Sequence, residues 1–312
     1  MDNFIIAFNA VMPLMIYLGV GYFINKLGWM SNKSLQELNQ LIFKLLLPIN
    51  LFMNIYKTDI SQAFKLDVLI YAILMALLIF ILFLIIIAKI EKDPAKQGVM
   101  LQGSIRSNFV LFGLPIAVSL LNGRDIGMTT ILIAALVPLN NVLSIIALTI
   151  YKNRNFNIKE LVLSVLKNYM FIATVLGIVV RLIGIRMPVF FADALDGLSG
   201  SITPIALLIM GATFNFKAIT ESFKQLTFII TSKLIIVPIL GIGGAILLGF
   251  TGENLIPLII FFGGPVAVSS YPMAQNMGGD GDLANQAVVF TTILSMFTLI
   301  IFITIAANLG IL

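Results

Sequence analysis

The side chains best suited to binding chemistry in this sequence are polar groups set inside long apolar runs. Arg106-Ser-Asn108 is the clearest case, because arginine offers a planar fork that matches a carboxylate. Asn50 and the pair Asn140-Asn141 each follow a proline in another apolar run. A charged group in such surroundings is costly and is a functional candidate by default. The alternatives are that Arg106 pairs with backbone carbonyls and that the asparagines form interhelical hydrogen bonds.

Acidic residues are missing from these runs. All 14 Asp and Glu residues fall in expected loops, at the ends of the sequence or at the edges of apolar runs. A proton antiporter built on buried carboxylates therefore lacks its working groups. The remaining polar groups are neutral or cationic, and helix N-termini add partial positive charge. This combination favours an anion, and we infer a substrate that carries a carboxylate.

One eight-residue motif occurs twice and places helix breakers inside apolar runs. Residues 112–119 read FGLPIAVS and residues 262–269 read FGGPVAVS, with six of eight positions identical. A proline inside a helix removes a backbone donor and breaks or kinks the helix. Such a break is tolerated at membrane depth only where it is buried in protein or lines a watery cavity. The predicted substrate-binding residues are Asn50, Arg106, Asn108, Gly113, Pro115, Asn140, Asn141, Pro265 and Ser269.

Composition predicts an all-α polytopic membrane protein. The 312 residues are 60% hydrophobic and 11% charged, and the apolar runs do not alternate as barrel strands would. Without Cys or His the chain lacks thiolate metal ligands and the commonest general base, so we expect no cofactor and no enzymatic activity. The net charge of +5 is dispersed through membrane loops, so we expect no nucleic-acid partner.

Ten membrane-spanning helices are predicted, as two inverted repeats of five. The first five cover residues 4–24, 38–56, 66–88, 98–121 and 126–150, and the second five cover 161–183, 198–216, 226–250, 255–277 and 283–308. The polar loop 151–160 divides the chain into repeats 1–155 and 156–312. An odd number of spans inserts the halves with opposite orientation, and the broken helices are the fourth and the ninth. Paired broken helices in inverted repeats are typical of secondary transporters.

Charge placement predicts the orientation in the plasma membrane. Of 19 Lys and Arg residues, 11 lie in loops after odd-numbered spans and 5 lie on the opposite side. This bias predicts that both termini are extracytoplasmic. Lys44 and Lys233 lie inside spans, near the cytoplasmic ends, and we expect their stems to reach the interface. The alternative is that they face the binding site.

Two longer segments resemble signatures of the auxin efflux carrier family, which includes bacterial malate permeases. The first is Arg106-Ser-Asn-Phe109 followed by FGLPIA, and the second is residues 264–280 (GPVAVSSYPMAQNMGGD) followed by residues 291–295. The resemblance covers essentially the whole chain. It implies a scaffold of spans 1, 2, 6 and 7, often dimeric, and a transport domain of spans 3–5 and 8–10.

The same resemblance implies that the broken spans cross near Pro115 and Pro265. It also implies that Asn50 and Asn140 or Asn141 help to bind a substrate carboxylate. Many plant members of the family carry a long hydrophilic insert between spans 5 and 6, whereas this chain has only the loop 151–160. An organic acid such as malate is therefore a better expectation than auxin.

The favoured function is a permease for small organic anions that works by alternating access, with the lipid bilayer and a second copy of the chain as partners. The main rival is a sodium-coupled organic-anion symporter of the bile-acid type, because buried amide and hydroxyl oxygens can coordinate sodium. A channel is another alternative. The last alternative is an intramembrane enzyme that uses a Ser–Lys pair with Lys44 or Lys233. No recognisable nucleophile motif surrounds either lysine.

Overall fold

The computed structural model describes residues 2–57, 65–110, 116–117, 120–121, 127–151 and 158–312. Within these ranges the fold is helical, and the single pairing of β type is an isolated bridge between Ser107 and Val266. The predicted all-α class is therefore confirmed for the part of the chain that the structure describes.

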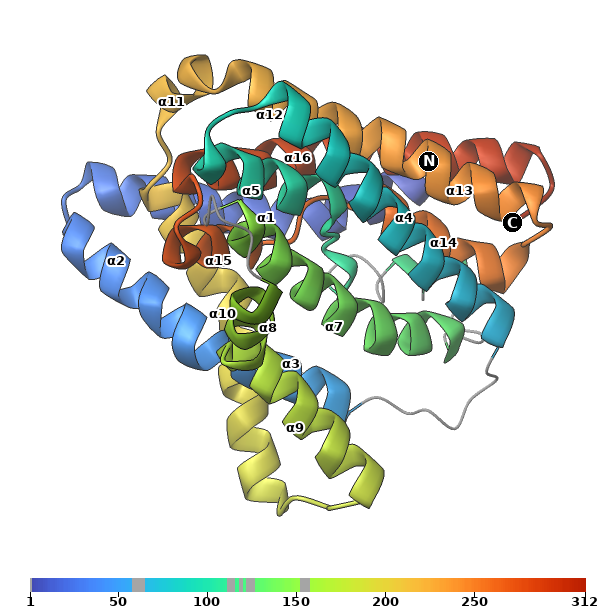
Figure 1. The fold of residues 1–312 in the computed structure, drawn as a ribbon, viewed down its shortest axis with the longest axis horizontal. Helices are drawn as coiled ribbons and strands as arrows, with labels where there is room; N and C mark the ends of the chain where they lie inside the picture. Colours follow the sequence, from blue (N-terminus) through green and yellow to red (C-terminus); the bar gives the residue numbers. More distant parts are fainter. Residues whose placement is uncertain (1, 58–64, 111–115, 118–119, 122–126, 152–157) are drawn as a thin grey trace.

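In chain order, which Figure 1 shows by colour, a first group of helices precedes residue 155 and a second group follows it. The first group contains α1 (Asp2–Lys26), α2 (Asn32–Leu41), η1 (Ile42–Leu46), α3 (Leu47–Tyr56), α4 (Leu66–Ile90), α5 (Pro94–Ile105) and α7 (Gly127–Ile150). The second group contains α8 (Ile158–Leu166), α9 (Tyr169–Ile183), α10 (Val189–Ala212), α11 (Phe216–Glu221), α12 (Phe223–Thr231), η2 (Ser232–Ile236), α13 (Val237–Leu247), η3 (Gly252–Asn254), α14 (Leu255–Gly263), α15 (Ser270–Met277) and α16 (Gly281–Asn308).

Side-chain caps account for the points at which several helices begin. Ser31, Asp93, Asn168 and Asp280 each stand just before a helix, and each accepts a hydrogen bond from a backbone N–H of its first turn, at 2.9–3.1 Å. These bonds satisfy donors that have no partner within the helix. A glycine ends helix α15. Gly278, at its C-terminus, has φ +86°, a left-handed conformation that favours glycine.

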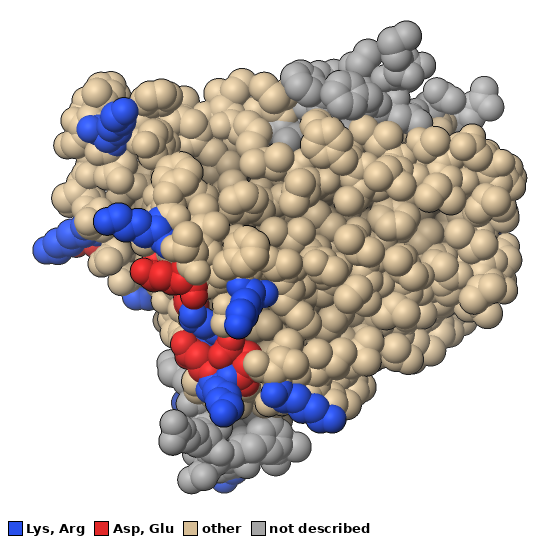
Figure 2. All heavy atoms as spheres, turned by 90° about the horizontal axis from the view of Figure 1, so that it is seen from above, with Lys and Arg blue, Asp and Glu red and all other residues tan. Residues whose placement is uncertain are grey.

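Six segments of the described chain are long and apolar enough to cross a membrane. They are Asn32–Tyr56, Leu66–Ile90, Gly127–Ile150, Val189–Ala212, Phe223–Leu247 and Gly281–Asn308. Figure 2 shows charged side chains gathered along one edge of the molecule, with a broad uncharged face beside them. Such a face suits hydrocarbon. The predicted total of ten spans stays a prediction.

Two of these segments contain a π-helical turn directly before a proline. The turn η1 precedes Pro48 and the turn η2 precedes Pro238. A proline clashes with the carbonyl four residues earlier, which here belongs to Lys44 or Leu234. The wider π turn moves that carbonyl, so each helix continues past its proline.

The helices pack in two sets. In one set α1 lies along α10 and α3 lies along α9, while α10 also packs on α3. In the other, α5 packs against α4 and α7, and α14 packs against α13 and α16. In Figure 1, α9 and the first turns of α10 form the hairpin at the bottom, while α13, α14 and α16 lie toward the upper right.

Reciprocal glycines bring α1 and α10 into backbone contact. A Cβ added at Gly21 would lie 2.0 Å from the Leu208 carbonyl oxygen, and one added at Gly211 would lie 2.0 Å from that of Leu18. Small residues permit this close approach, which is a main source of helix association in lipid.

We predict that Gly21→Ala destabilises the protein by about 1–3 kcal/mol, because the new methyl group forces the α1 and α10 backbones apart. Gly19→Ala is the matched control on the same helix, since its Cβ would meet no atom within 4 Å. Thermal unfolding of both variants in detergent measures the difference. Equal unfolding temperatures for the two variants would contradict the close contact.

Candidate functional site

Two interrupted helices meet at the centre of the site. Helix α5 ends at Ile105 and α14 ends at Gly263, and an extended segment follows each. Ser107 and Val266 form the antiparallel bridge, in which the Asn108 N–H donates to the Pro265 carbonyl at 2.8 Å. The Val266 N–H donates to the Thr291 hydroxyl of α16 at 3.1 Å. Each break thus satisfies part of the other's backbone, as burial in a membrane protein requires.

Glycine at position 264 permits this crossing. A Cβ there would lie 2.7 Å from the Ile260 carbonyl oxygen and 2.8 Å from the Ser107 hydroxyl oxygen. Both distances are shorter than a carbon–oxygen contact allows. Any larger residue would therefore move Ser107, the residue that bridges to Val266.

The structure shows an interruption that we did not predict, at Arg106–Asn108, where the backbone is extended after α5 ends at Ile105. We expected a break at Gly113–Pro115. Gly113 and Pro115 themselves fall outside the described residues, and so does the predicted crossing at Pro115. Ser and Asn favour non-helical backbone. The bridge to Val266 supplies the hydrogen bonds that a continued helix would have made.

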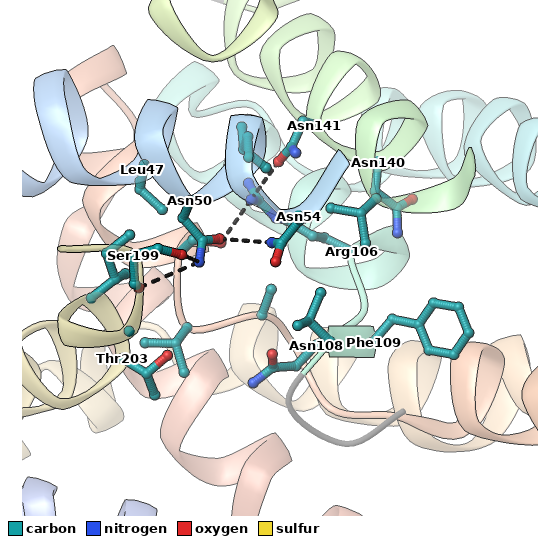
Figure 3. A pocket seen from close by; sticks show the side chains of 18 of the residues that line it. Leu47, Asn50, Asn54, Arg106, Asn108, Phe109, Asn140, Asn141, Ser199 and Thr203 are labelled. Atoms are coloured by element: carbon teal, nitrogen blue, oxygen red, sulfur yellow. Dashed lines mark hydrogen bonds between the residues drawn. The ribbon is translucent and has the colours of Figure 1, made fainter. Parts of the chain in front are cut away.

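A cavity of about 390 Å³ adjoins the crossing. One wall comes from α1, α3 and α10, and the other comes from α7 and the two breaks. Its polar lining residues are Tyr17, Asn50, Asn54, Arg106, Ser107, Asn108, Asn140, Asn141, Asp196, Ser199, Thr203 and Ser269. Figure 3 shows Arg106 close to Asn141 of α7 and to Asn50 and Asn54 of α3.

Arg106 is buried at the cavity wall. One guanidinium nitrogen, Nη2, donates to the Asn141 side-chain oxygen at 2.6 Å and to the Ser269 hydroxyl at 2.7 Å. The other, Nη1, contacts the sulfur of Met273. All three partners are neutral, and among the described residues no carboxylate pairs with this guanidinium. A buried cation without a counter-charge is costly, so the site is suited to an anion.

Amide groups surround the arginine. Asn50 donates to the Ser199 hydroxyl at 2.8 Å and accepts from Asn54 at 3.0 Å (Figure 3). The side-chain amide nitrogens of Asn108 and Asn141 are buried and find no acceptor among the described residues. An unsatisfied buried donor costs about 1–3 kcal/mol. A ligand rich in acceptor atoms would remove that cost.

Most of the predicted site residues come together in this cavity. Those that line it are Asn50, Arg106, Asn108, Asn140, Asn141 and Ser269. Pro265 contributes its carbonyl to the crossing instead. The prediction missed Asn54, Ser199 and Thr203, although Asn54 follows Asn50 by four residues and Thr203 follows Ser199 by four. That spacing places each pair on one helix face.

Asp196 corrects the expectation that every acid lies in a loop or at a span edge. It lies inside α10 and lines the cavity. Its carboxylate pairs with Lys57, and both side chains are about half exposed, 52% and 51%. This ion pair balances the negative charge where the cavity meets the surface, so it leaves the charge of Arg106 unmatched.

Comparison with known proteins places the chain in a family. Residues 6–303 match the family model described as membrane transport protein. The chain belongs to this family, the auxin efflux carrier family. It is also similar to an uncharacterized transporter of Methanothermobacter thermautotrophicus, at 23% identity over 305 residues that cover 93% of this chain and 95% of that protein. The protein is therefore a multi-pass membrane transporter.

For this member of the family, we predict that Gly264→Ala impairs transport and lowers stability by about 2 kcal/mol, because the added methyl group strains the crossing. Gly263→Ala is the control, since its Cβ would meet side chains and no backbone, namely the end of Leu299 at 3.0 Å and the ring of Phe302 at 4.0 Å. Substrate flux in proteoliposomes, together with thermal unfolding, measures both effects. A Gly264→Ala protein with normal flux would show that the crossing tolerates displacement.

Proposed function

We propose that this transporter carries small organic anions such as malate across the plasma membrane by alternating access, with the substrate carboxylate bound at the crossing. The observation that carries the proposal is the state of Arg106. It is buried at the wall of a 390 Å³ cavity and donates only to neutral partners in the described structure. Its planar fork suits a carboxylate, which would supply the missing counter-charge.

The groups around Arg106 support an acceptor-rich ligand. The free donors of Asn108 and Asn141 belong to the same cavity lining. A carboxylate has two oxygens that together accept about four hydrogen bonds, enough for the guanidinium and both amides. The cavity volume lies within the range of small-molecule sites.

The packing of the helices supports ten spans in two inverted repeats, residues 1–155 and 156–312. In that arrangement α1, α3, α9 and α10 are spans 1, 2, 6 and 7. The pair α1 with α10 is then equivalent to the pair α9 with α3, and both pairs pack closely. We assign these four spans to a scaffold, through which the chain dimerises, and spans 3–5 and 8–10 to a transport domain.

Polar contacts outside the cavity lining join the proposed scaffold to the proposed transport domain. Asn39 of α2 bonds to Gln275 of α15. The Tyr271 hydroxyl lies 2.9 Å from that of Thr213, and Asn285 donates to the Met210 carbonyl at 2.8 Å. With extracytoplasmic termini these contacts lie on the cytoplasmic side and the Lys57–Asp196 pair lies on the other. Breaking the contacts on the cytoplasmic side would open the cavity to the cytoplasm.

We predict that Arg106→Gln weakens carboxylate binding on the order of 10- to 100-fold, because charge-assisted hydrogen bonds are lost. A thermal-shift screen against mono- and dicarboxylates first identifies a ligand, since one that binds only the folded state raises apparent stability. Affinity for that ligand is then measured in the wild type, Arg106→Gln and Arg106→Lys. The lysine variant keeps the charge and loses the fork, so we expect an intermediate affinity. Unchanged affinity in Arg106→Gln would assign Arg106 a structural role.

We predict that uptake of the identified anion by proteoliposomes is saturable and does not depend on a sodium gradient. Malate uptake is measured with sodium and with potassium at equal ionic strength. Loss of uptake in potassium would favour the sodium symporter over this proposal. Flux that rises linearly with concentration, without acceleration by internal substrate, would favour a channel.

A further inference from the structure

The described structure contains a lysine that the binding site does not explain. Lys233 lies in the π turn η2 and its exposed fraction is 0%. It therefore does not reach the interface, which corrects our sequence-based expectation. Lys44 lies in the other π turn, η1, and is exposed as expected. No ion pair joins the Lys233 amine to any other described residue.

A small cavity beside Lys233 shares the lining residue Asn140 with the substrate cavity. Its volume is about 10 Å³, close to the minimum that holds one water molecule. Asn140 is its other polar lining residue, and the rest are Ala76, Ile79, Ile105, Val237, Phe261 and Phe262. Asn140 also lines the large cavity. Asn140 is therefore the residue that Lys233's cavity and the proposed carboxylate site have in common.

The surroundings of Lys233 offer no fixed counter-charge among the described residues. The elements that pack against η2 or line its cavity carry their charged residues only in first or last turns, and none of these lines the cavity. They are Asp67 and Lys89 on α4, Lys96 on α5, Lys224 on α12 and Asp282 on α16. Tyr71 of α4 donates its hydroxyl proton to the Gly241 carbonyl. Arg106, which follows Ile105, adds repulsion toward an ammonium.

The protonation state of the Lys233 amine should respond to an anion in the large cavity. An unpaired ammonium is costly in apolar surroundings, whereas a neutral amine is not. An anion beside Asn140 would attract the ammonium and would neutralise Arg106. We propose that Lys233 takes up one proton when a carboxylate occupies the large cavity, so that anion and proton cross together. The step is protonation of the amine, with the proton drawn from solvent on the side of loading and returned on the side of release.

The inference rests on the proposed carboxylate function and predicts a reciprocal effect. If the bound anion favours protonation of Lys233, then protonation of Lys233 strengthens anion binding by the same factor. As the pH rises, malate affinity should fall on the order of tenfold per pH unit in the range where binding takes up one proton. Above about pH 6.5 simple carboxylates are already ionised, so their own titration does not contribute.

The test is calorimetric titration of the purified full-length protein with malate in two buffers of different ionisation enthalpy. We expect uptake of about one proton per malate in the wild type and in Lys44→Met, the matched variant of the other π turn. In Lys233→Met we expect no proton uptake and an affinity that no longer changes with pH. Both results would support the coupling.

Other outcomes separate the two proposals. Malate binding by the wild type without proton uptake overturns the coupling and leaves the carboxylate site standing, and this measurement does not require that any variant folds. Affinity that is lower by the same factor at every pH in Lys233→Met overturns the coupling, because it assigns the lysine a fixed charge. Absence of binding by malate and by every other carboxylate tested overturns both proposals.

Discussion

The hydrogen bond from the Asn108 N–H to the Pro265 carbonyl joins two helices that have each lost their own continuity. Interrupted backbone inside a membrane needs partners, and here each interruption supplies them to the other. Gly264 permits the approach, and Thr291 satisfies the neighbouring Val266 N–H. Because the chain leaves α5 at this point, Arg106 stands at the cavity wall rather than on a helix face packed against lipid.

Charge imposes the second constraint. The site holds a guanidinium, several amides and hydroxyls, and its one carboxylate is already paired with a lysine. Such a site gains most from a ligand that brings negative charge and acceptor atoms together. Lys233 is a second buried cation, and its small cavity shares Asn140 with the site. The coupling that we propose between anion binding and ionisation of this amine would follow from ordinary electrostatics.

Much of this arrangement could be predicted from the sequence, because polar residues in apolar runs are rare and visible. Asn50, Arg106 and Asn140 were identified in this way. The interruption at Arg106–Asn108 was not predicted, since Ser107 pairs there with Val266, 159 residues later in the chain, and no local proline marks it. Asp196 and Lys233 were also misplaced. Whether a charge near a helix end reaches solvent depends on the neighbouring helices, which the sequence does not list.

The reciprocal glycine contacts of α1 and α10 fix the position of one helix along the other. Gly21 meets Leu208 and Gly211 meets Leu18, so the two backbones touch at two points about one helical turn apart. Sliding either helix would bring a side chain against a carbonyl, and rotation would separate the contacts. The wall that carries Ser199 therefore keeps one position relative to α1. In the alternating-access cycle that we propose, this wall is the fixed one, and the opposite wall moves past it with the ligand.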